Sequence, residues 1–170
     1  MKKLFLLALF AVITLLSSQA QEEKYIGLFV YNFTKHFDWP AEAKSGEFRI
    51  QVIGHKSVGD ELKSLTAGKS VGHQRIVVEQ IELPSQINPN THILFLGHWQ
   101  TRHLETVKAN ISGKSILLVT EFEGLIQKGA MINFVIREGK IKFELNYVNA
   151  NTAGLTIDQR LKELAYQVIE

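Results

Sequence analysis

Four short runs of mainly apolar residues constrain the fold of this 170-residue chain more than any other feature of its sequence. Residues 92–96 (HILFL) and 115–120 (SILLVT) are nearly continuous apolar runs, and residues 48–53 (FRIQVI) and 75–81 (RIVVEQI) contain several β-branched side chains. Short apolar runs of this kind are typical of strands that are buried on both faces, as in parallel sheets covered by helices.

Helical segments separate these strands. Residues 22–37, 58–65 and 101–109 are predicted to be helices, and the first of them should end near Phe37 or Asp38 because Pro40 cannot continue a helix. This first helix carries apolar residues at i, i+3 and i+4 spacing, which predicts one buried face. The stripe consists of Ile26, Phe29, Val30, Phe33 and Phe37.

The last third of the chain has a different pattern. Residues 131–136 and 141–145 are predicted to be two strands of a hairpin, since the short gap between them contains Gly139. A C-terminal amphipathic helix is predicted from Ile157, Leu161, Leu164, Ala165 and Val168. Together these elements predict an α/β protein: a single three-layer domain with a mixed, mostly parallel sheet, a C-terminal β-hairpin and flanking helices.

The first 20 residues have the pattern of a secretory signal peptide. Residues 1–3 form a short basic start, residues 4–16 are almost entirely apolar, and small residues precede a cut after Ala20. The apolar run is shorter than the about 20 residues that span a membrane. We therefore expect residues 1–20 to be a cleaved signal peptide, residues 21–170 to form one domain, and the mature protein to be periplasmic.

Charge and cysteine content narrow the function classes. Lys2 and Lys3 account for two of the 19 basic residues, so their removal leaves 17 basic residues against 17 acidic ones. A neutral domain does not favour nucleic acid, which requires a basic face. The chain contains no cysteine, which excludes disulfides and thiol redox chemistry.

Two Gly-Lys-Ser tripeptides resemble part of a phosphate-binding loop. That loop requires a glycine five positions before the motif glycine, between a strand and the helix that it opens. Residues 63 and 108, where these glycines would stand, are lysines, and both tripeptides precede strands. Residues 68–70 and 113–115 are therefore interpreted as helix-to-strand turns.

Two of the predicted strands end in Gly-His. These are Gly54-His55 and Gly97-His98, and ligands of open α/β sheets lie beyond the carboxyl ends of the strands. If the two strands are parallel neighbours, His55 and His98 share a rim that could bind a small ligand. A zinc site would need one or two further ligands, so surface or capping histidines are the favoured interpretation.

The acidic residues give no catalytic signal. Glu121 and Glu123 flank Phe122, and Asp60 adjoins Glu61, but neither pair resembles a positioned acid and base. No serine is marked as a nucleophile by its sequence context. We expect no catalytic residue, no cofactor and no bound metal.

The aromatic stretch YNFTKHFDWP at residues 31–40 ends the first helix. Trp39 is predicted to seal the end of this helix against the sheet. Tyr31, Lys35 and His36 lie off the apolar stripe, which makes them candidates for a surface that contacts a partner.

Short motifs in a fixed order cover most of the chain after residue 20. They are YNFTK (31–35) leading to WP (39–40), VIG (52–54), GKSVG (68–72) leading to RIVV (75–78), HILFL (92–96), GAMINF (129–134), IKFELN (141–146) and AGLTI (153–157). In this order and spacing the sequence resembles the YfiR-like periplasmic proteins.

The resemblance implies a secreted α/β domain without catalytic activity. It implies a regulator that binds the periplasmic sensor region of an inner-membrane diguanylate cyclase and holds it inactive, so that its release raises cyclic di-GMP and promotes biofilm growth. An outer-membrane lipoprotein that sequesters the regulator is a further implied partner. A homodimer is also expected, because relatives dimerise and the hairpin offers a sheet edge.

The sequence departs from the family in its lack of cysteine. Thr91 stands where relatives often have a cysteine that can form a disulfide, so the trigger is not thiol redox. The resemblance also does not identify the membrane partner, because a sensor histidine kinase is an equally suitable target for a small periplasmic protein that covers a sensor domain. Two alternative functions are a periplasmic module that binds a small ligand or metal near His55 and His98, and a hydrolase. A hydrolase would need a convergent acid, base or metal cluster.

Overall fold

The computed structural model describes residues 21–170, so the predicted signal peptide at residues 1–20 lies outside the described part. None of the helices in residues 21–170 combines the length and the hydrophobicity that crossing a bilayer requires.

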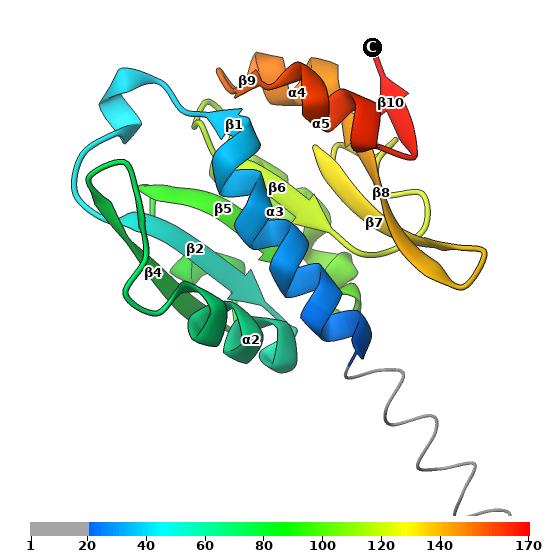
Figure 1. Cartoon of the computed structure of the whole chain (residues 1–170), viewed down its shortest axis with the longest axis horizontal. Coiled ribbons are helices and arrows are strands. Elements are labelled where there is room, and N and C mark those ends of the chain that lie inside the picture. The colour runs from blue at the N-terminus through cyan, green and yellow to red at the C-terminus, as the bar shows by residue number, and fades with distance from the viewer. Residues whose placement is uncertain (1–20) are drawn as a thin grey trace, which may run out of the picture.

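A mixed eight-stranded sheet forms the centre of the molecule (Figure 1). Its spatial order is β10-β8-β7-β6-β5-β2-β4-β3. The five central strands from β7 to β4 are mutually parallel, β8 and β3 are antiparallel to their inner neighbours, and β10 is parallel to β8. The strands are β2 (Phe48–Ile53), β3 (Ser70–Val71), β4 (Gln74–Ile81), β5 (Thr91–Leu96), β6 (Leu117–Thr120), β7 (Ile132–Arg137), β8 (Lys140–Asn146) and β10 (Gln167–Ile169).

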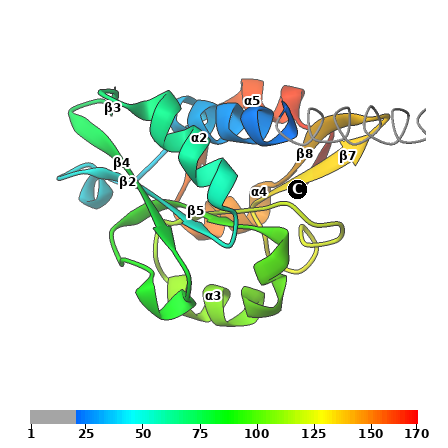
Figure 2. The same cartoon turned by 90° about the horizontal axis from the view of Figure 1, so that it is seen from below.

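Helices cover both faces of this sheet, which confirms the predicted α/β class. Figure 2 shows the N-terminal helix, α2 and α5 on one side and α3 on the other. A separate two-stranded ribbon pairs the end of the N-terminal helix with the C-terminal region. The remaining elements are the helix over residues 21–36, α2 (Lys56–Thr66), α3 (Leu104–Ile111), α4 (Tyr147–Thr152), α5 (Gln159–Leu164), the 3-10 turns η1 (Ala41–Ala43), η2 (Pro84–Gln86) and η3 (His98–His103), and the ribbon strands β1 (Phe37–Asp38) and β9 (Thr156–Ile157).

Strand β5 shows why its sequence is apolar throughout. All six of its residues are buried. Ile93 and Phe95 face the larger core beneath the N-terminal helix, whereas Leu94 and Leu96 face the smaller core beneath α3. Because successive side chains of a strand point to opposite faces, a strand covered on both faces needs apolar residues at every position.

The N-terminal helix packs as its sequence predicts. It ends at residue 36, and Phe33 and Phe37 are buried in the larger core. Trp39 is 3% exposed, and its ring meets Phe48 of β2 edge to face with 4.9 Å between centroids. The structural role predicted for Trp39, sealing the helix end against the sheet, is therefore confirmed.

The Gly-Lys-Ser segments are turns, as expected. Gly68 follows α2 and Gly113 follows α3, and both adopt a positive φ, 71° and 72°. This left-handed conformation favours glycine and commonly ends a helix. Neither segment opens a helix that could hold a phosphate.

The C-terminal helix was predicted too long. Helix α5 begins after Asp158, whose side chain caps it, and ends at Leu164, while Val168 lies in β10 paired with Leu145 of β8. The chain leaves the helix because the unpaired edge of β8 offers backbone partners, and Tyr166 N–H donates to the Phe143 carbonyl at 2.8 Å.

This added strand shortens the sheet edge that was the reason for expecting a dimer. Strand β10 pairs with residues 144–146 of β8, so within residues 21–170 only residues 140–143 of that edge lack a strand partner. The hairpin itself is confirmed: β7 and β8 pair antiparallel through a turn at Glu138 and Gly139, both with positive φ.

Candidate functional site

Three neighbouring parallel strands end at the same edge of the sheet. Strand β2 pairs with β5, and β5 pairs with β6, all in parallel. His55, His98 and Glu121 follow the last residues of these strands directly or after one glycine. The topology therefore brings together side chains that are up to 66 positions apart in the sequence, since Glu121 follows His55 by that number.

Two glycines let the strand ends approach one another. Gly54 has a φ of 71°, which turns the chain from β2 toward α2. Gly97 lies so close that a Cβ atom added to it would be 2.8 Å from the Gly54 carbonyl oxygen. The Gly97 N–H also donates to the Ile53 carbonyl at 2.8 Å. The two Gly-His pairs are thus a structural requirement for placing the imidazoles side by side.

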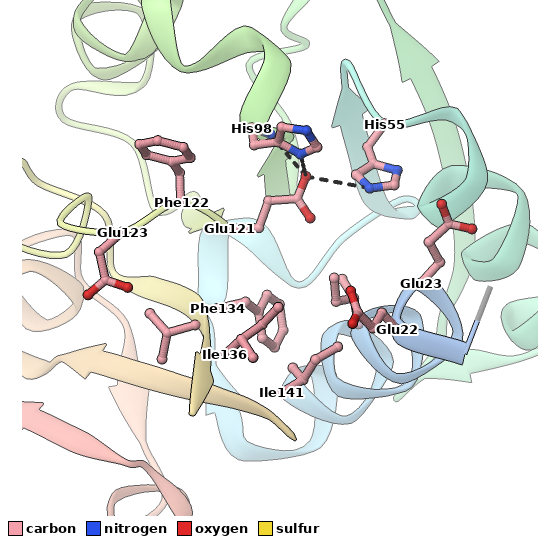
Figure 3. Close-up of a pocket in the computed structure, with 12 residues that line it drawn as sticks. Glu22, Glu23, His55, His98, Glu121, Phe122, Glu123, Phe134, Ile136 and Ile141 are labelled. Atoms are coloured by element: carbon pink, nitrogen blue, oxygen red, sulfur yellow. Dashed lines mark hydrogen bonds and ion pairs between the residues drawn. The ribbon is translucent and has the colours of Figure 1, made fainter. Parts of the chain in front are cut away.

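Glu121 lies between the two histidines (Figure 3). One of its carboxylate oxygens is 3.2 Å from His98 Nδ1 and 3.6 Å from His55 Nε2. The same oxygen accepts the backbone N–H of His98 at 2.9 Å. The imidazole centroids of His55 and His98 are 6.0 Å apart.

The environment of this carboxylate is unusual for a glutamate. Its side chain is only 7% exposed. Burial raises the pKa of Glu121 above its ordinary value, and His55 together with the hydrogen bonds from His98 opposes this rise. A buried carboxylate that needs compensation from its neighbours marks a candidate functional site.

A pocket of about 400 Å³ opens beside this cluster. Figure 3 shows the cluster on one side and the apolar side chains of Phe134, Ile136 and Ile141 on the other. Glu22 and Glu23 of the N-terminal helix and Glu123 also line it. The described lining residues include no serine, threonine, cysteine or lysine, so the acid–base groups of the pocket are carboxylates and imidazoles, without a hydroxyl, thiol or amine nucleophile beside them.

Glu123 is engaged elsewhere. It forms a two-pronged pair with Arg137, with N–O distances of 2.7 and 3.0 Å. The hydrogen bond from this guanidinium lowers the pKa of Glu123. Glu121 and Glu123 therefore have different environments, although only Phe122 separates them.

A buried polar network supports the loop that carries Glu121. The Asn133 side-chain oxygen accepts from the Thr120 hydroxyl at 2.7 Å and from the Phe122 N–H at 3.2 Å, while its amide donates to Glu144 at 2.9 Å. Because each of these groups is held by the next, the position of Glu121 depends on β7 and β8 as well as on β6.

The sequence analysis placed the two histidines correctly but missed Glu121. His55 and His98 share a rim, as expected if their strands are parallel neighbours. The sequence analysis compared Glu121 only with acidic residues close to it in sequence, so it did not find the contacts of Glu121 with His55 and His98. The available signal was its place directly after the buried strand β6.

The other histidines do not join this cluster. Among residues 21–170, His55, His98 and Glu121 form the one group of at least three potential metal ligands whose donor atoms all lie close together. His92 is buried near Trp39, accepts the Arg49 N–H at 3.1 Å, and has a pKa lowered by burial. The rings of His73 and His103 lie elsewhere on the surface or in turns.

The residues proposed as a partner surface lie close together at the end of the N-terminal helix and have partners within the chain. The amines of Lys35 and Lys69 lie over the Tyr31 ring, 4.7 and 4.3 Å from its centroid. His36 Nδ1 is 3.5 Å from an Asp158 carboxylate oxygen. Of the three proposed residues, Lys35 is exposed, whereas Tyr31 and His36 are half-buried.

Large apolar side chains are exposed at the carboxyl edge of the sheet instead. Trp99 is 76% exposed, Phe122 is 52% exposed and Ile136 is 56% exposed. They follow or end three adjacent strands, β5, β6 and β7. We call these three residues the carboxyl-edge apolar surface.

Comparison with known proteins gives both a family and a fold. A family profile described as YfiR/HmsC-like matches residues 24–166, which confirms the resemblance seen in the motifs. No curated protein matches the sequence.

Two solved structures share the fold at low identity. One is the ABC domain in complex with L-Trp from Streptococcus pneumonia, with a TM-score of 0.52, 12% identity, and coverage of 72% of this chain and 55% of that one. The other is a conserved domain protein from Vibrio cholerae O1 biovar eltor, with a TM-score of 0.50, 12% identity, and coverage of 71% and 54%. The chain thus spans little more than half the length of these structures, and the likeness concerns the α/β fold alone.

Proposed function

Since this chain belongs to the YfiR/HmsC-like family of periplasmic regulators of cyclic di-GMP signalling, we propose that it binds the periplasmic sensor region of an inner-membrane diguanylate cyclase and represses it. The family match over residues 24–166 is the observation that carries this proposal. The protein acts in it as a binding partner and not as an enzyme.

The carboxyl-edge apolar surface supports a role in binding another protein. Tryptophan is among the residue types most enriched at binding hot spots, and Trp99 is 76% exposed. Its ring lies against the His98 ring, tilted by 45° with 4.3 Å between centroids, and this contact restricts its orientation on the surface. An exposed aromatic ring that is already oriented loses little conformational entropy on binding.

Repression then follows from binding one state of the sensor better than the other. A ligand shifts a two-state equilibrium only by its differential affinity for the two states. Moving a sensor from 1:99 to 99:1 in favour of the inactive state requires about 5.5 kcal/mol of such a difference. A few aromatic anchors that become buried only against the inactive state supply a difference of this order.

Affinity capture from solubilised inner membranes tests the proposal. The mature protein, residues 21–170, is immobilised, and the retained membrane proteins are identified by mass spectrometry. We expect a protein with a periplasmic sensor and a cyclase output to be retained by the wild type and lost with Trp99→Ala.

Leu164→Ala is the matched control, because Leu164 is 64% exposed but lies on α5, away from the carboxyl edge. Capture that survives Trp99→Ala would move the binding surface elsewhere, with Tyr31, Lys35 and His36 the next residues to test. Recovery of a sensor histidine kinase would keep the binding role and change the output. Recovery of no sensor protein would contradict the proposal.

A further inference from the structure

The cluster at the carboxyl edge has the composition of a metal site. His55, His98 and Glu121 each offer one donor atom, and these atoms all lie within 4.8 Å of one another. Two imidazoles and one carboxylate are a common ligand set for zinc and for other first-row divalent ions, with the remaining positions taken by water or another ligand.

The distances also suit a single ion. Two ligand atoms that are about 2.0–2.1 Å from zinc in tetrahedral geometry lie about 3.3 Å from each other. The Glu121 oxygen is 3.2 Å from His98 Nδ1 and 3.6 Å from His55 Nε2. The donor nitrogens of His55 and His98 lie within 4.8 Å of each other, so side-chain rotation that brings the two imidazoles closer lets all three donors reach one ion.

The ligands are held in advance by the backbone. Each follows a buried strand of one sheet, and the Gly97 N–H joins the ends of β2 and β5 at 2.8 Å. The backbone N–H of His98 orients the Glu121 carboxylate at 2.9 Å. Outer hydrogen bonds of this kind fix the ligands of metal sites and raise their affinity.

The pocket beside the cluster favours a cation. Glu22 and Glu23 line it together with Glu121, and no lysine or arginine is among the described residues lining it. Within residues 21–170, neither Glu22 nor Glu23 takes part in an ion pair. The pocket also leaves space for water or a small ligand on the open side of the ion.

From these observations we propose that His55, His98 and Glu121 bind one first-row divalent metal ion, of which Zn²⁺ is the probe, at the carboxyl edge of the sheet. The site is independent of the proposed partner: it depends on the geometry of three side chains and not on what the carboxyl-edge apolar surface contacts. Its open side faces the pocket, so the ion can take a further ligand from solution.

The competing explanation is a structural ion pair. In that case Glu121 pairs with the two histidines, and the cluster stabilises the fold without binding metal. The two explanations differ in what Zn²⁺ does to the purified protein.

Isothermal titration calorimetry with ZnCl₂ separates them. The mature protein is produced without a histidine tag and stripped with EDTA. We expect one equivalent of Zn²⁺ to bind, and Glu121→Gln and His98→Ala each to weaken binding by more than the roughly 10- to 100-fold that loss of an outer-shell partner costs. His73→Ala, which removes a surface histidine outside the cluster, should leave the affinity unchanged.

Glu121→Gln keeps the size of the side chain, and circular dichroism checks that each variant is folded. A second measurement uses Co²⁺ in place of Zn²⁺, since visible absorption reports the coordination directly and should be lost in Glu121→Gln. Absence of one-to-one binding by the wild type, or equal weakening by His73→Ala and His98→Ala, would overturn the proposal.

Discussion

Replacing Trp39 by alanine tests the packing that closes the N-terminal helix. The ring is 3% exposed and contacts the rings of Phe37, Phe48 and His92. A tryptophan buries up to about 250 Å², which at about 25 cal/mol per Å² corresponds to about 6 kcal/mol of transfer free energy. Within residues 21–170 the indole N–H has no hydrogen-bond partner, and such a group costs about 1–3 kcal/mol.

The expected loss in the free energy of unfolding is therefore about 3–5 kcal/mol, the range found for tryptophan in protein cores. Urea unfolding of residues 21–170, followed by far-UV circular dichroism, measures it. Trp99→Ala is the matched control, because Trp99 is 76% exposed and a surface change should alter stability by no more than about 0.5 kcal/mol. A loss below about 1 kcal/mol for Trp39→Ala, or equal losses for the two variants, would refute the reasoning.

Three further predictions concern the strand ends and the core. Gly97→Ala should cost about 1–3 kcal/mol through overpacking, because the new Cβ would meet the Gly54 carbonyl oxygen at 2.8 Å. Gly27→Ala is its control in urea unfolding: the new Cβ there meets only the side chains of Glu61 and Leu65, of which Glu61 is flexible, so the change should be neutral or stabilising. Equal effects of the two changes would contradict this. Asn133→Ala should lower stability by about 1.5–3 kcal/mol, since it removes the 2.9 Å hydrogen bond to buried Glu144; a loss below about 0.5 kcal/mol would show that the network adds nothing. Burial lowers the pKa of His92, so the unfolded chain binds a proton at this histidine more readily than the folded protein does. The stability that neutral His92 contributes is therefore present above about pH 6.5 and is lost as the pH falls from there toward the pKa of the folded state. Unfolding measured between pH 7.5 and pH 5 should thus show a smaller decrease with His92→Gln than with the wild type, and identical pH profiles would contradict the assignment.

The fold was largely predictable because the apolar pattern reports burial directly. A strand such as β5, with every residue buried, has no polar face to hide its identity, and the stripe from Ile26 to Phe37 needs only its spacing to predict a helix. The C-terminal strand β10 was missed for a different reason. Val168 continues a helical spacing locally, but the edge of β8 supplies backbone partners, and no local pattern records such a long-range contact.

The candidate site was predictable only in part. Two Gly-His pairs after strands identified His55 and His98, because parallel neighbours end at one edge. Glu121 required the order of the strands in space: it joins the histidines because β6 lies next to β5. The carboxyl-edge apolar surface needed the structure as well, since exposure of Trp99 follows from its place on η3 and not from its neighbours in sequence.

The most direct test of the central claim is the cellular level of cyclic di-GMP. It is measured by mass spectrometry in a strain that lacks this protein, and in the same strain complemented with the wild type or with Trp99→Ala. A repressor of a diguanylate cyclase predicts that the level rises on deletion, returns with the wild type, and stays high with a folded Trp99→Ala variant. A level that does not change on deletion would contradict the proposed function.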